Sequence, residues 1–363
     1  DNQPALIITS PCLLIFGLFG LSPTFLNSMM IFTLIVTHLI ILAIVCIILY
    51  IISYLQSGKR LEAKGGHVFI TGGSSGIGKA LAIEFVKKGA CVTIAARDQG
   101  NLKEAETEIK AFIKDADSQK VQWVAMDVSK DYVDVERSMN KAESKLGPIS
   151  ILVNCAGSSV SGTFEDLPVE KFQQMMQINY LGSVYPTKAV VKSMKARRQG
   201  RIVFVSSQAG QLGVYGYTAY SPSKYALRGL AESLQMEVKP YNIYVTIAFP
   251  PDTDTPGFTN EQIGKPKETQ LISQTSGLFK AECVARSIME DTLNGRFLCS
   301  VGLDGWMLGC LTCGMTPVTS ALDGIQQVFL MGLFRLVSAL YLVSFDRIVQ
   351  QCHRERKQKE KSS

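Results

Sequence analysis

The feature that most constrains this chain is a regular alternation of short apolar runs and helical segments between residues 65 and 300. A strand–helix alternation predicts a parallel sheet with helices on both faces. The apolar runs are nearly continuous, as expected for strands that are buried on both sides. We therefore predict a doubly wound α/β domain with six or seven strands. The runs are HVFIT, CVTIAA, VQWVAM, ISILVN, RIVFVS and IYVTIAF, with helices expected at 77–89, 98–114, 131–146, up to 198, 218–239 and 281–294.

An uncharged segment before this domain predicts a membrane anchor. Residues 31–55 contain no Lys, Arg, Asp or Glu, and a spanning helix needs about 20 apolar residues. Lys59, Arg60 and Lys64 follow directly, so the positive-inside rule places this end in the cytosol. We assign residues 1–58 to the anchor.

Further upstream, residues 5–26 are also apolar but are interrupted by Pro11 and Pro23. A signal-like segment, an extra span and an interfacial piece are all compatible with this pattern.

The C-terminal region is apolar again. Residues 306–322 are uncharged, and 328–345 contain only Arg335. Two membrane-associated segments joined by a turn, an interfacial amphipathic pair, and a helix pair packed on the domain are the alternatives. We assign 305–346 to this apolar segment and 347–363 to a basic, disordered cytosolic tail near anionic lipid.

The overall composition agrees with a membrane protein and excludes some partners. Charged residues make up 19% of the chain, below the usual quarter. The net charge of +6 is modest, and no basic stripe interleaved with aromatics is present, so nucleic acid is not an expected partner. Nine scattered cysteines indicate a reducing compartment rather than a disulfide framework. Cys310 and Cys313 form a lone C-x-x-C, which we interpret as apolar packing, with no metal expected.

A glycine-rich turn follows the first predicted strand and opens the first helix, with the sequence TGGSSGIG at 71–78. Glycine permits the tight turn and a close approach of the backbone to a pyrophosphate, which the helix N-terminus then faces. The turn predicts a Rossmann-type dinucleotide site. Its candidate cofactor-binding residues are Gly72, Ser74, Ser75, Gly76, Ile77 and Gly78.

The end of the second strand bears on cofactor choice. NAD-binding proteins place an acidic residue near this point, but here Ala96 is followed by Arg97. An Arg can pair with the 2′-phosphate of NADP(H), with Ser74 assisting. Asp98, the next residue, is the signal that favours NAD. We predict NADPH.

The catalytic signal is a Y-x-x-x-K motif formed by Tyr220 and Lys224. Residues four apart share one face of a helix, so the ammonium is expected to sit beneath the phenol and reach the nicotinamide ribose. A free Tyr has a pKa of about 10. A neighbouring cation favours the phenolate, and we expect it to lower that pKa.

Together these motifs resemble the short-chain dehydrogenase/reductase family over residues 65–300. The resemblance implies hydride transfer between a nicotinamide cofactor and a carbonyl. It also implies further roles for catalysis: Ser207, thirteen residues before Tyr220, would hydrogen-bond the substrate oxygen, with Ser206 as the fallback, and Asn179 would complete the proton relay.

The same resemblance implies further cofactor contacts. Asp127 would contact the adenine, although a helix-capping turn explains it nearly as well. Asn154 and Gly157 would steady the sheet and line the adenine ribose. In the loop FPPDTDTPGF, Pro250 and Thr255 match positions that grip the carboxamide.

Several longer runs resemble the members of this family that reduce long-chain sphingoid ketones: GRIVFVSSQAGQLG, SKYALRGLAESLQMEVKPYN, PPDTDTPGF, LTCGMTPVTS and MGLFR. This implies NADPH-dependent reduction of 3-ketodihydrosphingosine to dihydrosphingosine, in sphingolipid synthesis at the endoplasmic reticulum membrane, with the catalytic domain facing the cytosol. Expected partners are the sphingoid ketone, membrane lipid and a second copy, paired through the helices near Asn179 and Tyr220. Asp252 or Asp254 is expected to meet the substrate ammonium. A steroid or retinoid substrate and a non-catalytic cofactor-binding scaffold are the alternatives.

Overall fold

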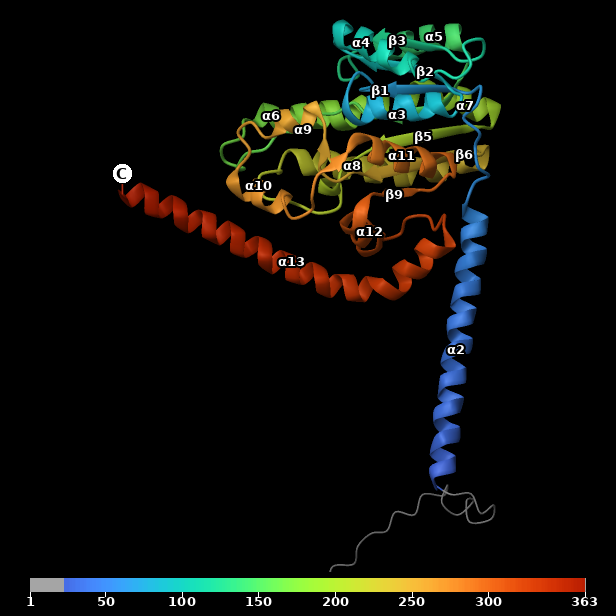
Figure 1. Ribbon diagram of the computed structural model, residues 1–363, viewed down its shortest axis with the longest axis vertical. Helices are drawn as coiled ribbons and strands as arrows, with labels where there is room; N and C mark the ends of the chain where they lie inside the picture. The colour runs from blue at the N-terminus through green and yellow to red at the C-terminus, as the bar shows by residue number, and fades with distance from the viewer. Residues whose placement is uncertain (1–22, 363) are drawn as a thin grey trace, which may run out of the picture. The chain divides into compact units, whose positions relative to one another are not determined.

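The computed structural model describes residues 23–362. The greater part of the upstream apolar stretch 5–26 therefore lies outside the described residues. The chain divides between Ile52 and Ser53 into an N-terminal unit and a larger unit that reaches the C-terminus. Figure 1 labels the elements of both units.

A seven-stranded parallel sheet forms the centre of the larger unit, in the order β3-β2-β1-β4-β5-β6-β9. The predicted doubly wound α/β fold is confirmed, with six strands at the expected runs and a short seventh. After β3 the chain crosses back to pair β4 with β1, which makes a topological switch point. Ligands bind at the carboxyl ends of the strands beside such a point. The strands are β1 (His67–Thr71), β2 (Cys91–Ala96), β3 (Val121–Ala125), β4 (Ile149–Asn154), β5 (Gly200–Val205), β6 (Ile243–Phe249) and β9 (Leu298–Ser300).

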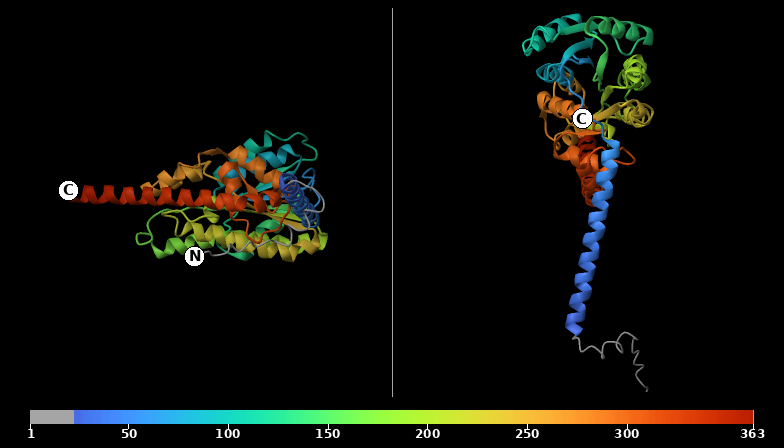
Figure 2. Two further views of the ribbon diagram at one scale, coloured as in Figure 1. Left: turned by 90° about the horizontal axis from the view of Figure 1, so that it is seen from below. Right: turned by 90° about the vertical axis from the view of Figure 1, so that its right-hand side faces the viewer.

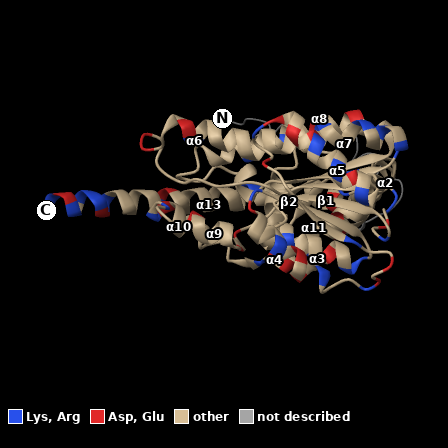
Figure 3. Ribbon diagram, turned by 90° about the horizontal axis from the view of Figure 1, so that it is seen from above, with Lys and Arg blue, Asp and Glu red and all other residues tan. Residues whose placement is uncertain are grey.

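Helices cover both faces of the sheet, and each layer buries its own apolar core. One core contains side chains of α3 (Gly76–Lys87), α4 (Gln99–Lys110) and α11 (Ala281–Leu293). The other contains side chains of α5 (Tyr132–Leu146), α7 (Gly182–Arg197) and α8 (Tyr220–Val238). Figures 2 and 3 show these helices on opposite sides of the sheet. Because β1 and β4 are buried on both faces, their apolar runs carry no alternation.

Several connections between strands and helices contain short elements. Between β4 and α7 lie α6 (Val169–Met175) and the π-helix η1 (Met176–Leu181), with the 3-10 turns η2 (Gln208–Gly210) and η3 (Lys239–Tyr241) later in the chain. A π-helical turn adds a residue to the helical register and often occurs at functional sites. After β6 come the two-residue strands β7 (Thr253–Asp254) and β8 (Phe279–Lys280), with α9 (Pro256–Glu261) and α10 (Lys267–Ser273) between them. The periodicity of the sequence did not predict α9 or α10.

Helix α2 (Pro23–Gln56) contains the predicted span 31–55. Residues Asn27–Gln56 are long and apolar enough to cross a membrane. Polar side chains within it bond to backbone carbonyls one turn earlier: Thr33 to Met29, and His38 Nδ1 to Leu34 at 2.7 Å. Such bonds satisfy polar groups where water is absent.

The C-terminal region differs from the predicted pair of segments. Helix α12 (Gly302–Leu311) is short, and α13 (Ala321–Ser362) is one continuous helix of 42 residues. Asp323 and Gly324 lie within its first turn rather than in a hairpin. The tail predicted to be disordered continues this helix, and ion pairs to α10 hold it. Residues Ala321–Lys361 form the second helix that is apolar and long enough to span a membrane. Cys310 and Cys313 are buried free thiols.

Candidate active site

The turn between β1 and α3 fits a dinucleotide because its backbone leaves no room for side chains at the glycine positions. Gly72 and Gly76 have φ angles of 68° and 52°, which other residues rarely adopt. A Cβ atom on Gly78 would lie 2.2 Å from the carbonyl oxygen of Gly72. Ser75 makes no side-chain cap, so the first amides of α3 can donate to a pyrophosphate. All six predicted turn residues line one cavity of about 880 Å³: Gly72, Ser74, Ser75, Gly76, Ile77 and Gly78.

At the end of β2, Arg97 favours NADP(H) and Asp98 favours NAD, and the structure gives these two residues different roles. Arg97 lines the same cavity and has an exposed side chain. Asp98 is the N-cap of α4, where its carboxylate accepts a hydrogen bond from the Asn101 amide at 2.9 Å. The acidic residue is therefore engaged in helix capping, while the guanidinium beside it is available to a ligand.

The next two predicted cofactor residues differ in position. Asp127 lines the cavity, and its Oδ1 accepts bonds from the amide and hydroxyl of Ser129 at 3.0 and 2.7 Å. Burial acts to raise the pKa of Asp127, but the bonds from Ser129 hold it below its ordinary value. Asn154 is buried and is not among the residues that line the cavity. Its amide donates instead to Thr187 of α7 at 3.0 Å, so it joins the sheet to a helix.

Tyr220 and Lys224 both line the cavity from the first turns of α8. The ammonium of Lys224 lies 5.8 Å from the centroid of the Tyr220 ring and donates to the carbonyl oxygen of Val205 at 3.0 Å. The motif therefore presents phenol and ammonium from one helix face, as its spacing predicts.

The two candidate serines occupy different environments. The Ser207 hydroxyl makes a side-chain hydrogen bond with Tyr220 and accepts one from the Ala209 amide at 3.1 Å. The hydroxyl of Ser206 is buried and donates to the carbonyl oxygen of Lys224 at 3.0 Å. Ser207 is thus the serine that contacts the phenol, while Ser206 fastens β5 to α8.

Asn179 lies in the π-helix η1 and is fully buried. It accepts from the Ser158 amide and donates to the Ser158 carbonyl and the Ser223 hydroxyl, each at 2.9 Å. Gly157 lies between this amide and the lysine. A Cβ atom there would be 2.8 Å from Asn179 Oδ1 and 3.3 Å from Lys224 Nζ. The structure thus brings Asn179, Gly157 and Lys224 together.

The pKa of Tyr220 lies above its ordinary value, whereas the sequence predicted a lowered one, and Lys224 is not among the groups that shift it. Burial raises the pKa of Tyr220 above its ordinary value, and the nearby Glu261 and Asp252 carboxylates raise it further, while the hydrogen bond with Ser207 opposes them. Burial also lowers the pKa of Lys224, to about 8. The phenol is therefore held protonated at neutral pH, ready to donate a proton.

The loop after β6 closes over the glycine turn. Pro250 and Thr255 both line the cavity, and Thr255 caps α9 by accepting from the Phe258 amide at 3.1 Å. A Cβ atom on Gly76 would lie 2.9 Å from Thr255 Cγ2. This contact places the loop beside the turn, and a grip on the carboxamide by Pro250 and Thr255 stays a prediction.

Three polar side chains near Tyr220 were missed by the sequence analysis. Tyr217 and Glu261 line the cavity, and Lys265 is buried behind Glu261. The Tyr217 hydroxyl donates to Glu261, and the Lys265 ammonium lies 2.9 Å from the same carboxylate oxygen. The Glu261–Lys265 spacing was the only available signal, and it is far more typical of an exposed surface pair.

Of the two aspartates expected to meet an ammonium, Asp252 lines this cavity and Asp254 is exposed outside it.

Comparison with known proteins identifies the family. The family model described as short chain dehydrogenase matches residues 66–265, more than half of the chain. The chain belongs to the short chain dehydrogenase family. The resemblance inferred from the motifs is confirmed, and membership in the family implies binding of a nicotinamide cofactor. Levodione reductase, a solved structure, has a TM-score of 0.59 at 21% identity and covers 65% of this chain and 95% of its own. It shares the fold.

Two curated relatives are much more similar in sequence. The chain is 57% identical over 312 residues to the 3-dehydrosphinganine reductase of Danio rerio, covering 86% of this chain and 94% of that protein. It is 58% identical over 306 residues to the 3-ketodihydrosphingosine reductase of Bos taurus, covering 84% and 92%. Both matches extend well beyond the family model, so the likeness includes parts of the chain outside the cofactor-binding core.

Proposed function

We propose that this chain reduces 3-ketodihydrosphingosine to dihydrosphingosine with NADPH, as a step of sphingolipid biosynthesis. The observation that carries the proposal is the convergence of Ser207, Tyr220 and Lys224 on the cavity that the glycine turn also lines. The names of relatives 57% and 58% identical to this chain support the substrate.

In the proposed reaction the ketone carbon gains a hydride and its oxygen gains a proton, which gives a secondary alcohol. The reduced cofactor, when bound, supplies the hydride. Ser207 and Tyr220 donate hydrogen bonds to the carbonyl oxygen as negative charge develops on it, and Tyr220 transfers its phenolic proton. A raised pKa keeps that proton on Tyr220 until the charge appears. Lys224, with a pKa of about 8, resupplies the proton, and Asn179 holds the relay in position.

The preference for NADPH rests on the residues after β2. Arg97 provides a planar cation that pairs with a phosphate, and Ser74 lines the same cavity. Asp98, which would favour the ribose hydroxyl of NAD, is engaged as the N-cap of α4. A guanidinium at this position, beside an Asp98 carboxylate that caps a helix, favours the phosphorylated cofactor.

A long-chain substrate suits the remainder of the cavity. Apolar side chains from several segments line it: Leu212, Val214, Phe258, Ile272 and Phe345. Phe345 belongs to α13, so the apolar C-terminal helix contributes to the wall. Keeping each methylene of an acyl chain out of water is worth about 0.8 kcal/mol.

The two apolar helices indicate membrane association. As the resemblance implies, we place the chain in the endoplasmic reticulum membrane, with residues 1–58 as the anchor. We place residues 65–300 in the cytosol because Lys59, Arg60 and Lys64 follow α2. A homodimer that pairs through the helices near Asn179 and Tyr220 stays a prediction of the resemblance.

The test is NADPH oxidation by the purified full chain in detergent with 3-ketodihydrosphingosine, compared with a ketosteroid and with retinal. We expect turnover of the sphingoid ketone, with formation of dihydrosphingosine. Tyr220→Phe removes the transferable proton and is expected to lower kcat by about 10²- to 10⁴-fold. Tyr225→Phe is the matched control, because Tyr225 lies on the same helix and is 41% exposed.

Each alternative has its own outcome. Faster reduction of the steroid or of retinal than of the sphingoid ketone would reassign the substrate and leave the chemistry intact. Equal dihydrosphingosine output from cells that carry the wild-type chain and from cells that carry Tyr220→Phe would indicate a non-catalytic scaffold.

A further inference from the structure

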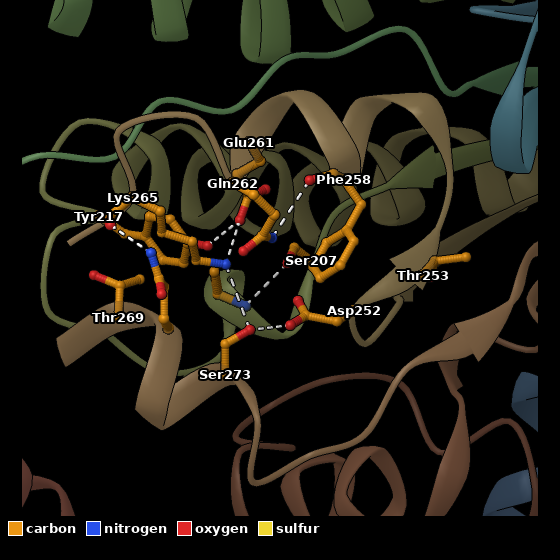
Figure 4. A network of polar contacts seen from close by, with 12 residues as sticks. Ser207, Tyr217, Asp252, Thr253, Phe258, Glu261, Gln262, Lys265, Thr269 and Ser273 are labelled. Atoms are coloured by element: carbon orange, nitrogen blue, oxygen red, sulfur yellow. Dashed lines mark hydrogen bonds and ion pairs between the residues drawn. The ribbon is translucent and has the colours of Figure 1, made fainter. Parts of the chain in front are cut away.

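A connected set of buried polar side chains lies beside Tyr220 and is not used by the proposed proton transfer. Glu261 accepts from Tyr217 and pairs with Lys265, whose ammonium also lies 3.4 Å from the hydroxyl of Ser273. That hydroxyl in turn donates to Asp252. Figure 4 shows these side chains, brought from four separate segments, linked one to the next.

The charges in this set do not balance. Two carboxylates share one ammonium, which leaves one negative charge uncompensated. The side chain of Lys265 has 0% exposure and lies closest to Glu261, at 2.9 Å. Asp252 contacts the ammonium only through the Ser273 hydroxyl. Burial raises the pKa of Asp252, although the hydrogen bond from Ser273 and the charge of Lys265 act in the opposite direction. Of the two carboxylates, Asp252 is therefore the one without a direct contact to the ammonium.

The excess charge faces the reacting centre. Asp252 and Glu261 line the cavity together with Tyr220 and Ser207, whereas Lys265 does not. Both carboxylates act on the phenol, since each raises the pKa of Tyr220. The cation of the network thus lies behind the carboxylates, and the open side of Asp252 faces the space where a substrate would meet the phenol.

We infer that Asp252, held by Ser273 and the Glu261–Lys265 pair, binds the ammonium of a substrate that carries an amino group next to the ketone. The inference rests on the proposed function and specifies which part of the substrate the site recognises. An amino ketone places its cation one carbon from the reacting carbonyl, so one substrate reaches Tyr220 and Asp252 together. The ammonium also offsets the carboxylates that oppose ionisation of Tyr220, which makes the phenol a better acid when this substrate is bound.

Asp254 provides a matched comparison. It lies two residues away in the same loop but is exposed and outside the cavity. If only the negative charge of this loop mattered, both aspartates would contribute equally to binding of the substrate ammonium. If the ammonium is bound within the cavity, only Asp252 contributes.

The experiment compares 3-ketodihydrosphingosine with the 1-hydroxy-3-ketone of equal chain length that lacks the amino group, using the full chain in detergent. The measured quantity is the ratio of kcat/KM for the amino ketone to kcat/KM for the amino-free ketone. A hydrogen-bonded charge predicts a ratio of about 10 to 100 for the wild-type chain. Asp252→Asn is expected to bring this ratio close to one, and Asp254→Asn to leave it unchanged.

A wild-type ratio near one overturns the inference even if Asp252→Asn does not fold, because the wild-type measurement needs no variant. An equal loss for both ketones in Asp252→Asn also overturns it, since that result indicates a structural role. Failure of the proposed function has a different signature: the wild-type chain would then reduce neither ketone with NADPH.

Discussion

Replacing Lys265 by Met tests whether the buried ion pair beside the active site is held as the structure indicates. Met retains most of the length and apolar character of the side chain but removes its charge. The carboxylate of Glu261, whose side chain is 12% exposed, would then lose the ammonium 2.9 Å away. Leaving one partner of a buried pair uncompensated costs about 3–5 kcal/mol. For a domain of this size each kcal/mol corresponds to about 2 °C in Tm, so we expect a fall of about 6–10 °C.

The assay is thermal unfolding of the purified full chain in one detergent, followed by intrinsic fluorescence. The double variant Lys265→Met/Glu261→Gln leaves no buried charge in the pair and should recover most of the lost Tm. Lys267→Met is the control, because Lys267 is 60% exposed and pairs with Glu355. Such a surface pair is worth about 1 kcal/mol or less. A fall below about 2 °C for Lys265→Met, or a double variant as unstable as the single one, would refute the reasoning.

Three further predictions concern the cofactor and the proton relay. Gly157→Ala would place a Cβ atom 2.8 Å from Asn179 Oδ1; we expect kcat to fall by about 10- to 100-fold while NADPH binding, measured by fluorescence titration, persists, and unchanged turnover would contradict this. Arg97→Ala should raise KM for NADPH by about tenfold or more and leave KM for NADH unchanged; a parallel change in both would exclude a 2′-phosphate contact. Because Lys224 has a pKa of about 8 and resupplies protons in its charged form, the rate of reduction should fall as pH rises through that value, and a kcat profile that is flat there would rule out this role.

The cofactor half of the site was predictable because its constraints are local. A buried strand, a turn that excludes side chains and a helix N-terminus follow one another within residues 67–87. The positive φ angles of Gly72 and Gly76 can be expected from residue type alone. The Tyr220–Lys224 spacing is local in the same sense, since one helical turn fixes it.

The part of the site that would hold the substrate could not be predicted from the sequence, because its side chains come from distant segments. Glu261 and Lys265 meet Tyr217 and Ser273 only after the loop beyond β6 folds over the cavity. The burial that makes these charges significant is a property of the assembled domain. The same limit explains the error about the phenol, because the carboxylates that raise the pKa of Tyr220 lie about 30 to 40 residues further along the chain.

Helix α13 illustrates how tertiary contacts choose among alternatives that the sequence left open. Near its start the helix packs on α12, where Trp306 Nε1 donates to Gln326 at 3.0 Å and the Trp306 ring lies 5.0 Å from that of Phe334. Near its end, Arg356 pairs with Glu268 of α10, whose side chain is only 1% exposed. Both parts of the helix are therefore fixed to the same domain.

A helix fixed to one domain near both ends cannot carry those ends to opposite sides of a bilayer. Its 42 residues span about 63 Å, and Phe345, between the two attachment points, lines the active-site cavity. The outward side of the helix carries exposed apolar side chains, among them Leu336 and Leu340 with 62% and 65% exposure, a pattern typical of a helix that lies in a membrane interface. The contacts thus favour the packed and the interfacial alternatives for this segment over a spanning one. One helix therefore supplies both part of the cavity wall and an exposed apolar surface.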